Sequence, residues 1–160
     1  MATANQNLSK YNLSSTPDGS DFEIHVVVSQ WNESITSSLC EGALETLKKH
    51  GVKESNIKVW NVPGSFELIY ASKKAQSYNP DAVIAIGSVI RGETQHFDFV
   101  CQGVTQGIVS LNLSSDRPVV FCVLTDNTLQ QAIDRSGGKH GNKGVEAAVT
   151  ALKMIALAKQ

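Results

Sequence analysis

The chain has 160 residues, of which 41% are hydrophobic, and its formal net charge at pH 7 is −1. This length suits one domain with a sizeable core, because a chain of about 150 residues buries roughly 68–70% of its unfolded surface. The near-zero net charge excludes a broad electrostatic attraction to nucleic acid or to a membrane surface.

The first 20 residues are rich in Asn, Ser, Thr and Gly, and Pro17-Asp18-Gly19 is a turn signal. We interpret residues 1–20 as an N-terminal arm, either flexible or docked, and residues 21–160 as one folded domain. No basic start followed by an apolar run is present, so we expect no signal peptide. The longest apolar stretch, from Ala82 to Ile90, is far shorter than the roughly 20 residues that a membrane helix needs.

Strand-like and helix-like patterns alternate along the rest of the chain. The expected strands cover residues 22–29, 57–62, 82–89 and 119–124. The first helix is indicated by apolar residues that recur every four positions from Ile35 to Leu47, and Gly51 ends it. Further helices are expected over 65–77, 97–112, 129–136 and 145–159, with Asp126, Asn127 or Thr128 capping the fourth. This alternation predicts a three-layer α/β fold with a flavodoxin-like, doubly wound sheet of four parallel strands.

The three cysteines, Cys40, Cys101 and Cys122, lie among apolar neighbours and show no CxxC spacing. We interpret them as small buried thiols of a cytoplasmic protein. A zinc site would need clustered Cys and His, and no such cluster is present, so we expect no metal.

Ligand-binding residues are expected in the loops that follow the strands, because open α/β sheets bind ligands beyond the carboxyl ends of their strands. Gly92-Glu93-Thr94 lies between a strand and a helix start, where unpaired N–H groups would form either an anion site or a plain helix cap. Neither a Walker loop nor a dinucleotide-binding glycine pattern is present.

Several side chains in these loops have both a structural and a functional interpretation. His96 would act as a general acid/base beside the anion turn, or it would be structural, as we expect for His25 and His50. The ring of Trp31 would stack on a flat heterocycle or fill a gap beneath a loop. Glu67 would accept hydrogen bonds from a ligand or stabilise a helix N-terminus by its charge.

A glycine-rich basic link, residues 135–144, joins the last two helices. Its cations would bind phosphate, or the link would be a hinge whose basic residues are favoured by the preceding helix C-terminus.

Taken together, four stretches resemble the signatures of the lumazine synthase family, in the family's order. They are Trp31-Asn32, residues 63–67 (PGSFE), residues 92–98 (GETQHFD) and residues 139–148 (KHGNKGVEAA). The resemblance runs from about Phe22 to the C-terminus. It implies condensation of 5-amino-6-(D-ribitylamino)uracil with 3,4-dihydroxy-2-butanone 4-phosphate to 6,7-dimethyl-8-ribityllumazine, with loss of phosphate and water and with no cofactor.

The resemblance also implies the roles of individual residues. His96 is the implied catalytic acid/base, and Glu93, Thr94 and Arg135 are the implied phosphate-binding residues. The implied substrate-binding residues are Trp31, Ser65, Phe66, Glu67, Ser88, Val89, Ile90, Phe121 and Lys143. Of these, Phe121 and Lys143, like Arg135, would reach the site from a neighbouring subunit. Trp31 stands where the family often has Phe, and Phe66 where it often has Trp.

The implied assembly is a homopentamer, or twelve pentamers in an icosahedral shell of sixty subunits, and a riboflavin synthase stays open as a partner. Two other classes stay open: a non-catalytic module that binds a flavin or lumazine, and a shell protein of the same fold without activity. The His96 position distinguishes the enzyme, because neither alternative needs a general acid/base.

Overall fold

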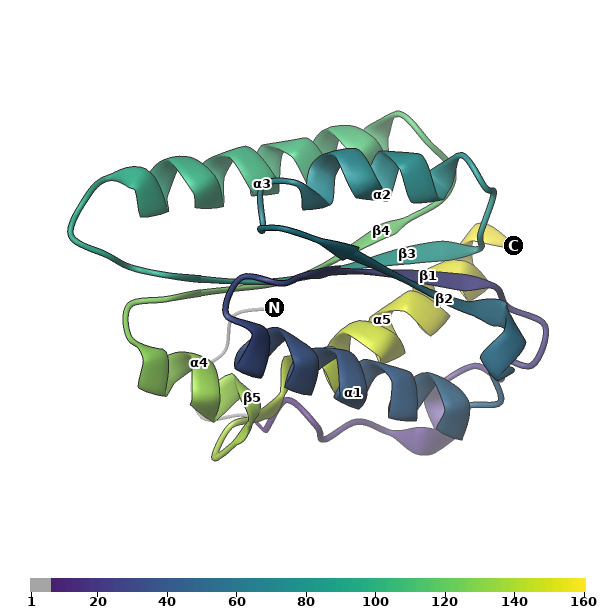
Figure 1. The fold of residues 1–160 in the computed structure, drawn as a ribbon. Coiled ribbons are helices and arrows are strands. Elements are labelled where there is room, and N and C mark those ends of the chain that lie inside the picture. The colour runs from purple at the N-terminus through teal and green to yellow at the C-terminus, as the bar shows by residue number, and fades with distance from the viewer. Residues whose placement is uncertain (1–6) are drawn as a thin grey trace.

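Four parallel strands form the central sheet in the order β2-β1-β3-β4 (Figure 1). The computed structural model describes residues 7–160, and its strands are β1 (Ile24–Ser29), β2 (Ile57–Val62), β3 (Ala82–Ile90) and β4 (Val119–Asp126). The helices are α1 (Glu33–Lys49), α2 (Leu68–Gln76), α3 (His96–Leu113), α4 (Leu129–Arg135) and α5 (Lys143–Ala158). Two short 3-10 helices cover Leu13–Ser15 and Glu54–Asn56. The predicted flavodoxin-like α/β fold is confirmed.

The sheet lies between two helical layers, with α2 and α3 on one face and α1, α4 and α5 on the other (Figure 1). Successive strand residues point to opposite faces. Accordingly, Ile24, Val26 and Val28 pack toward α1 and α5, whereas Val27 belongs to the core beneath α2 and α3. Strand β1 is buried along its whole length, as the nearly continuous apolar run from Ile24 to Val28 predicts.

The strand order reverses at β1 and β3, because the chain goes from β1 outward to β2 and then returns to β3 on the other side. Connections leave the carboxyl ends of these two strands in opposite directions, which opens a crevice between them. The fold therefore places the loops after β1, β2 and β3 around one position at the edge of the sheet.

Most predicted boundaries agree with the structure, and the differences cluster near this edge. Helix α2 begins at Leu68, three residues later than predicted, because residues 65–67 form a turn. Strand β3 continues to Ile90 and β4 to Asp126, since these two ends pair with each other. Gly51 has φ +89° and follows α1, and Thr128 caps α4 by accepting from the N–H of Gln131, both as predicted.

The glycine-rich link forms a small antiparallel hairpin instead of a simple hinge. Its strands are β5 (Ser136–Gly138) and β6 (Gly141–Asn142). Helix α5 begins at Lys143, two residues before the predicted start, because the Asn142 side chain caps it by accepting from the Gly144 N–H at 2.8 Å.

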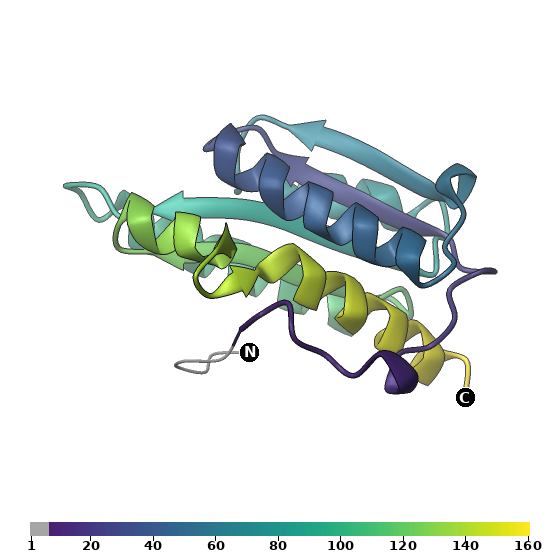
Figure 2. The same cartoon turned by 90° about the horizontal axis from the view of Figure 1, so that it is seen from below.

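The described part of the N-terminal arm is docked along α5 and the hairpin (Figure 2). The Leu8 N–H donates to the His140 carbonyl at 2.7 Å, and the Asn142 N–H donates to Ser9 Oγ at 3.0 Å. Farther along, the Gly19 N–H donates to the His50 carbonyl at 2.7 Å. Of the predicted arm, residues 1–6 lie outside the described residues.

The cysteine prediction is right for one thiol and wrong for two. Cys122 lies in the core, where burial raises its pKa to about 12, but Cys40 and Cys101 are only half-buried. Cys40 on α1 and Cys101 on α3 lie at the border between the buried and the exposed face of their helices, so the core covers each side chain only in part. Within residues 7–160, no helix has both the length and the apolar character to cross a membrane. The cytoplasmic location stays a prediction.

Candidate active site

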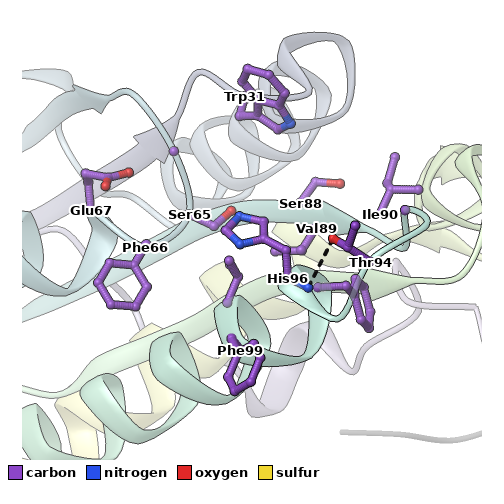
Figure 3. A pocket seen from close by; sticks show the side chains of 14 residues that line it. Trp31, Ser65, Phe66, Glu67, Ser88, Val89, Ile90, Thr94, His96 and Phe99 are labelled. Atoms are coloured by element: carbon purple, nitrogen blue, oxygen red, sulfur yellow. Dashed lines mark hydrogen bonds between the residues drawn. The ribbon is translucent and has the colours of Figure 1, made fainter.

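A cavity of about 680 Å³ lies at the carboxyl edge of the sheet, at the crevice that the strand order predicts (Figure 3). The loops after β1, β2 and β3 and the first turns of α3 form its walls. Its lining residues are Trp31, Gly64, Ser65, Phe66, Glu67, Ser88, Val89, Ile90, Gly92, Thr94, His96, Phe97, Phe99 and Val100. Nine of the thirteen predicted site residues are in this set.

Trp31 stands at the rim of the cavity, directly after β1. Its side chain is 70% exposed, so it does not fill a gap beneath a loop. The Trp31 N–H donates to the Pro63 carbonyl at 3.1 Å, and Asn32 Nδ2 donates to the Ser88 carbonyl at 2.9 Å. These bonds fix the loop backbone to the segment after β2 and to β3. The indole ring is therefore an exposed aromatic surface on an ordered loop at the cavity mouth.

Strand β3 extends past the end of its neighbour β1. Its last partner on β1 is Val28, opposite Ile86, whereas β4 pairs with β3 as far as Ile90. The β1-facing backbone edge of residues 88–90 is therefore open toward the cavity, apart from the Ser88 carbonyl that Asn32 contacts. Backbone N–H and C=O groups need partners when buried, so this edge suits a ligand with an amide-like edge.

The turn before α2 brings Ser65, Phe66 and Glu67 to the opposite wall (Figure 3). The hydroxyl of Ser65 is buried and has no hydrogen-bond partner among residues 7–160, which leaves a donor and an acceptor for a polar ligand. Phe66 is exposed, and Glu67 is the N-cap residue of α2 without a side-chain capping bond. Both interpretations of Glu67 stay open, because its position fits either.

His96 is the first residue of α3, and its imidazole points into the cavity (Figure 3). The His96 N–H is 3.4 Å from Thr94 Oγ1, which accepts from it. In the part of the chain that the structure describes, the N–H groups of Gly92, Glu93 and Thr94 have no backbone partner. The turn therefore presents free donors next to the imidazole, as an anion site requires.

Four predicted residues do not line the cavity. Glu93 is exposed on the anion turn. Phe121 is partly exposed on the edge strand β4, Arg135 ends α4, and Lys143 begins α5 with its Nζ 2.6 Å from Glu146 Oε1. Within a single chain, Phe121, Arg135 and Lys143 therefore lie apart from the rest of the predicted site.

The sequence reasoning missed three apolar residues, Phe97, Phe99 and Val100, which form part of the cavity wall. It also missed Asn32 as the residue that ties the Trp31 loop to β3. The signal for the apolar wall was present, because His96 is followed by apolar residues one, three and four positions later, on the helix turn that faces the same space.

These features define a class: a doubly wound α/β protein with a cavity at the carboxyl edge of its sheet, lined by an exposed aromatic ring, an open strand edge, a histidine and a glycine-containing turn. Residues 7–160 hold no group of three or more His, Cys, Asp or Glu side chains that could bind a metal ion. The expectation that no cofactor is used stays a prediction.

Comparison with known proteins gives the family. The family model described as 6,7-dimethyl-8-ribityllumazine synthase matches residues 21–159. Three similar relatives carry that name. The protein of Flavobacterium johnsoniae is 59% identical over all of this chain and 85% of its own length. The proteins of Christiangramia forsetii and Parabacteroides distasonis are 57% and 58% identical, over 99% and 97% of this chain and 96% and 98% of their own. The chain belongs to the 6,7-dimethyl-8-ribityllumazine synthase family.

Proposed function

We propose that the protein condenses 5-amino-6-(D-ribitylamino)uracil with 3,4-dihydroxy-2-butanone 4-phosphate to form 6,7-dimethyl-8-ribityllumazine in riboflavin biosynthesis. The observation that carries this proposal is the set of groups that line one cavity: an exposed Trp31 ring and an open β3 edge, the His96 imidazole, and the Gly92–Thr94 turn. A flat uracil matches the first pair, and a phosphate matches the last.

In this arrangement the Trp31 ring stacks on the pyrimidine, and the backbone of Ser88, Val89 and Ile90 pairs with its amide edge. The buried Ser65 hydroxyl, with Phe66 and Glu67, contacts the ribityl chain. The backbone N–H groups of Glu93 and Thr94, with the Thr94 hydroxyl, hold the phosphate end of the second substrate at the turn. The amine of the uracil then lies against the ketone carbonyl.

The chemistry begins when the amine attacks the ketone carbon and water leaves to form an imine. His96 moves the protons that this step and the phosphate elimination require. Lys143 stabilises the charge on the departing phosphate or on the carbonyl oxygen, and Arg135 binds the phosphate. Ring closure and dehydration complete the product. Much of the rate enhancement comes from holding two reactants in one cavity.

Turnover is the direct test. Purified protein dialysed against a chelator and mixed with both substrates should develop the absorbance band of the lumazine and release one phosphate per product, because no step uses a metal or a redox cofactor. The non-catalytic binding module would bind the product without forming it, and so would an inactive shell protein. An activity that depends wholly on added metal or nicotinamide would contradict the proposal.

We also propose that the working site is shared between subunits of a homopentamer. Phe121, Arg135 and Lys143 lie outside the cavity of their own chain, so their predicted roles need a neighbour. Large apolar side chains on α3, among them Phe99, Val109 and Leu113, are exposed in the single chain. Exposed apolar groups of this number favour burial in an interface.

Light scattering on gel-filtered protein measures the assembly. One chain has a mass of 17.2 kDa, so a pentamer has about 86 kDa and a sixty-subunit shell about 1 MDa. We expect the shell, because the hairpin between α4 and α5 is short and sets the angle between these helices. Four residues inserted between Gly138 and Lys139 should leave active pentamers and abolish the large particle. A single peak near the pentamer mass for the unaltered chain would exclude the shell.

A further inference from the structure

The turn that carries His96 has few constraints of its own. All residues from Arg91 to His96 are exposed, and a Cβ atom added at Gly92 would meet no atom within 4 Å. Gln95, the N-cap residue of α3, makes no side-chain capping bond, and the hydrogen bond from the His96 N–H to Thr94 Oγ1 is long at 3.4 Å. The position of the imidazole therefore depends on the start of α3, where Phe97 is buried, and on the contacts that hold this start against the rest of the chain.

Both ends of the turn meet at the guanidinium of Arg91. Arg91 Nη2 and Nη1 donate to Asp98 Oδ1 and Oδ2 at 2.8 and 3.2 Å, and the guanidinium carbon lies 4.2 Å from the centre of the Phe97 ring. Arg91 and Asp98 flank residues 92–97, so this two-bond pair closes the His96 turn into a loop. The hydrogen bonds from Arg91 lower the pKa of Asp98 below its usual range, which keeps the carboxylate charged at neutral pH.

A second set of bonds anchors this loop to the sheet. Arg91 Nε donates to Asn127 Oδ1 at 3.2 Å, and the Arg91 N–H donates to the Asp126 carbonyl at 2.9 Å. Asn127 lies just before Thr128, the N-cap of α4, and its own N–H donates to Gln131 Oε1 at 2.8 Å. One residue, Arg91, therefore joins the first turn of α3 to the end of β4 and to the segment between β4 and α4.

We propose that Arg91 is a positioning residue that holds His96 at the orientation needed for proton transfer. Arg91 does not line the cavity, and its Nε, Nη1 and Nη2 each donate to Asp98 or Asn127, so it acts through the turn and not by touching the substrate. A guanidinium suits this role better than an ammonium, because its planar fork binds a carboxylate with two bonds while it stacks on a ring. This inference rests on the proposed acid/base role of His96.

The test is a double-mutant cycle between Arg91 and His96. Arg91→Met keeps a long apolar stem over Phe97 but removes every side-chain hydrogen bond of the residue, and we expect kcat to fall about 10-fold, because small displacements of a catalytic group cost that much or more. In a His96→Ala background the same substitution should change kcat by less than about 2-fold, since no imidazole is left to position. Arg91→Lys should recover part of the loss.

Lys48→Met is the matched control. It removes another exposed ion pair, in which Lys48 Nζ lies 2.8 Å from Glu54 Oε1, at the end of α1 far from the site. We expect it to leave kcat unchanged in both backgrounds. If Arg91→Met fails to assemble, Arg91→Lys and the isosteric Asp98→Asn take its place in the same cycle, each with a smaller loss of kcat that disappears without His96.

Amide hydrogen exchange followed by mass spectrometry gives a readout that does not depend on turnover. Residues 92–98 should exchange faster in Arg91→Met than in the unaltered protein and in Lys48→Met. Wild-type kcat in Arg91→Met, an equal loss with and without His96, or unchanged exchange in the turn would each overturn the inference. If the unaltered protein forms no lumazine, the proposed function fails. The exchange data still show whether the Arg91 hydrogen bonds order residues 92–98.

Discussion

Replacing His96 by alanine should lower kcat by roughly 10–100-fold in a correctly assembled protein. A general acid/base usually contributes ~10²–10⁴-fold, but here two reactants held in one cavity already gain much of the rate by proximity. The imidazole lies beside the anion turn and points into the cavity, so its removal takes away a proton carrier without disturbing the core.

Two further variants test whether His96 acts by proton transfer or only by filling space in the cavity. His96→Gln keeps hydrogen-bonding groups but cannot exchange a proton near neutral pH, so it should lose nearly as much activity as the alanine variant. His50→Gln changes a histidine far from the cavity, whose Nε2 lies 3.2 Å from the Tyr11 hydroxyl, and should retain kcat. Full activity in His96→Gln would show that the side chain serves shape or hydrogen bonding and not acid/base chemistry.

Replacing Arg135 by alanine should raise the KM for the keto phosphate and leave the KM for the aminouracil nearly unchanged. Loss of a charged hydrogen-bond pair costs about 1.5–3 kcal/mol, or roughly a factor of 10–100 in binding. In the single chain, Arg135 Nη1 donates to the Gln131 carbonyl at 2.9 Å and lies 3.8 Å from Asp126 Oδ1. These contacts leave the guanidinium partly exposed and outside the lining of the chain's own cavity, where it could contact a phosphate bound by a neighbouring subunit.

Lys139→Ala is the matched control for charge. Lys139 is a nearby, more exposed cation on the same link, and its Nζ lies 3.1 Å from Asp134 Oδ2. Removing it changes the net charge by the same amount, so a general electrostatic effect would raise the KM of both variants equally. We expect a change of KM for Arg135→Ala alone.

Mixed oligomers test whether the site is shared. Subunits with His96→Ala and subunits with Arg135→Ala are denatured together and reassembled in equal amounts. If each site takes His96 from one chain and Arg135 from the next, about a quarter of the interfaces carry both native residues and recover activity. If both residues serve the site of their own chain, the mixture should be no more active than the average of the two variants reassembled separately.

The local sequence alone determined the kind and order of the elements. Apolar runs with polar borders located the four strands, and the four-residue repeat from Ile35 to Leu47 located α1, because burial on one face imposes these periods on the sequence. The same patterns placed Trp31 in the loop after the first strand and His96 at the helix start after the third strand's loop, and hence both at the ligand-binding edge of a parallel sheet. The boundaries that differed, such as the start of α2, depend on turns whose hydrogen bonds a periodic pattern does not encode.

The tertiary structure decided which of these residues meet. The open edge at residues 88–90 exists because β1 ends before β3 does, and that register depends on pairing between segments far apart in the chain. Contacts between distant segments also join Arg91 to Asn127. The packing of α4 likewise decides that Arg135 does not line the cavity of its own chain. Sequence periodicity reports the environment of one segment at a time, whereas a site is built from contacts between segments, and packing of the whole chain sets those contacts.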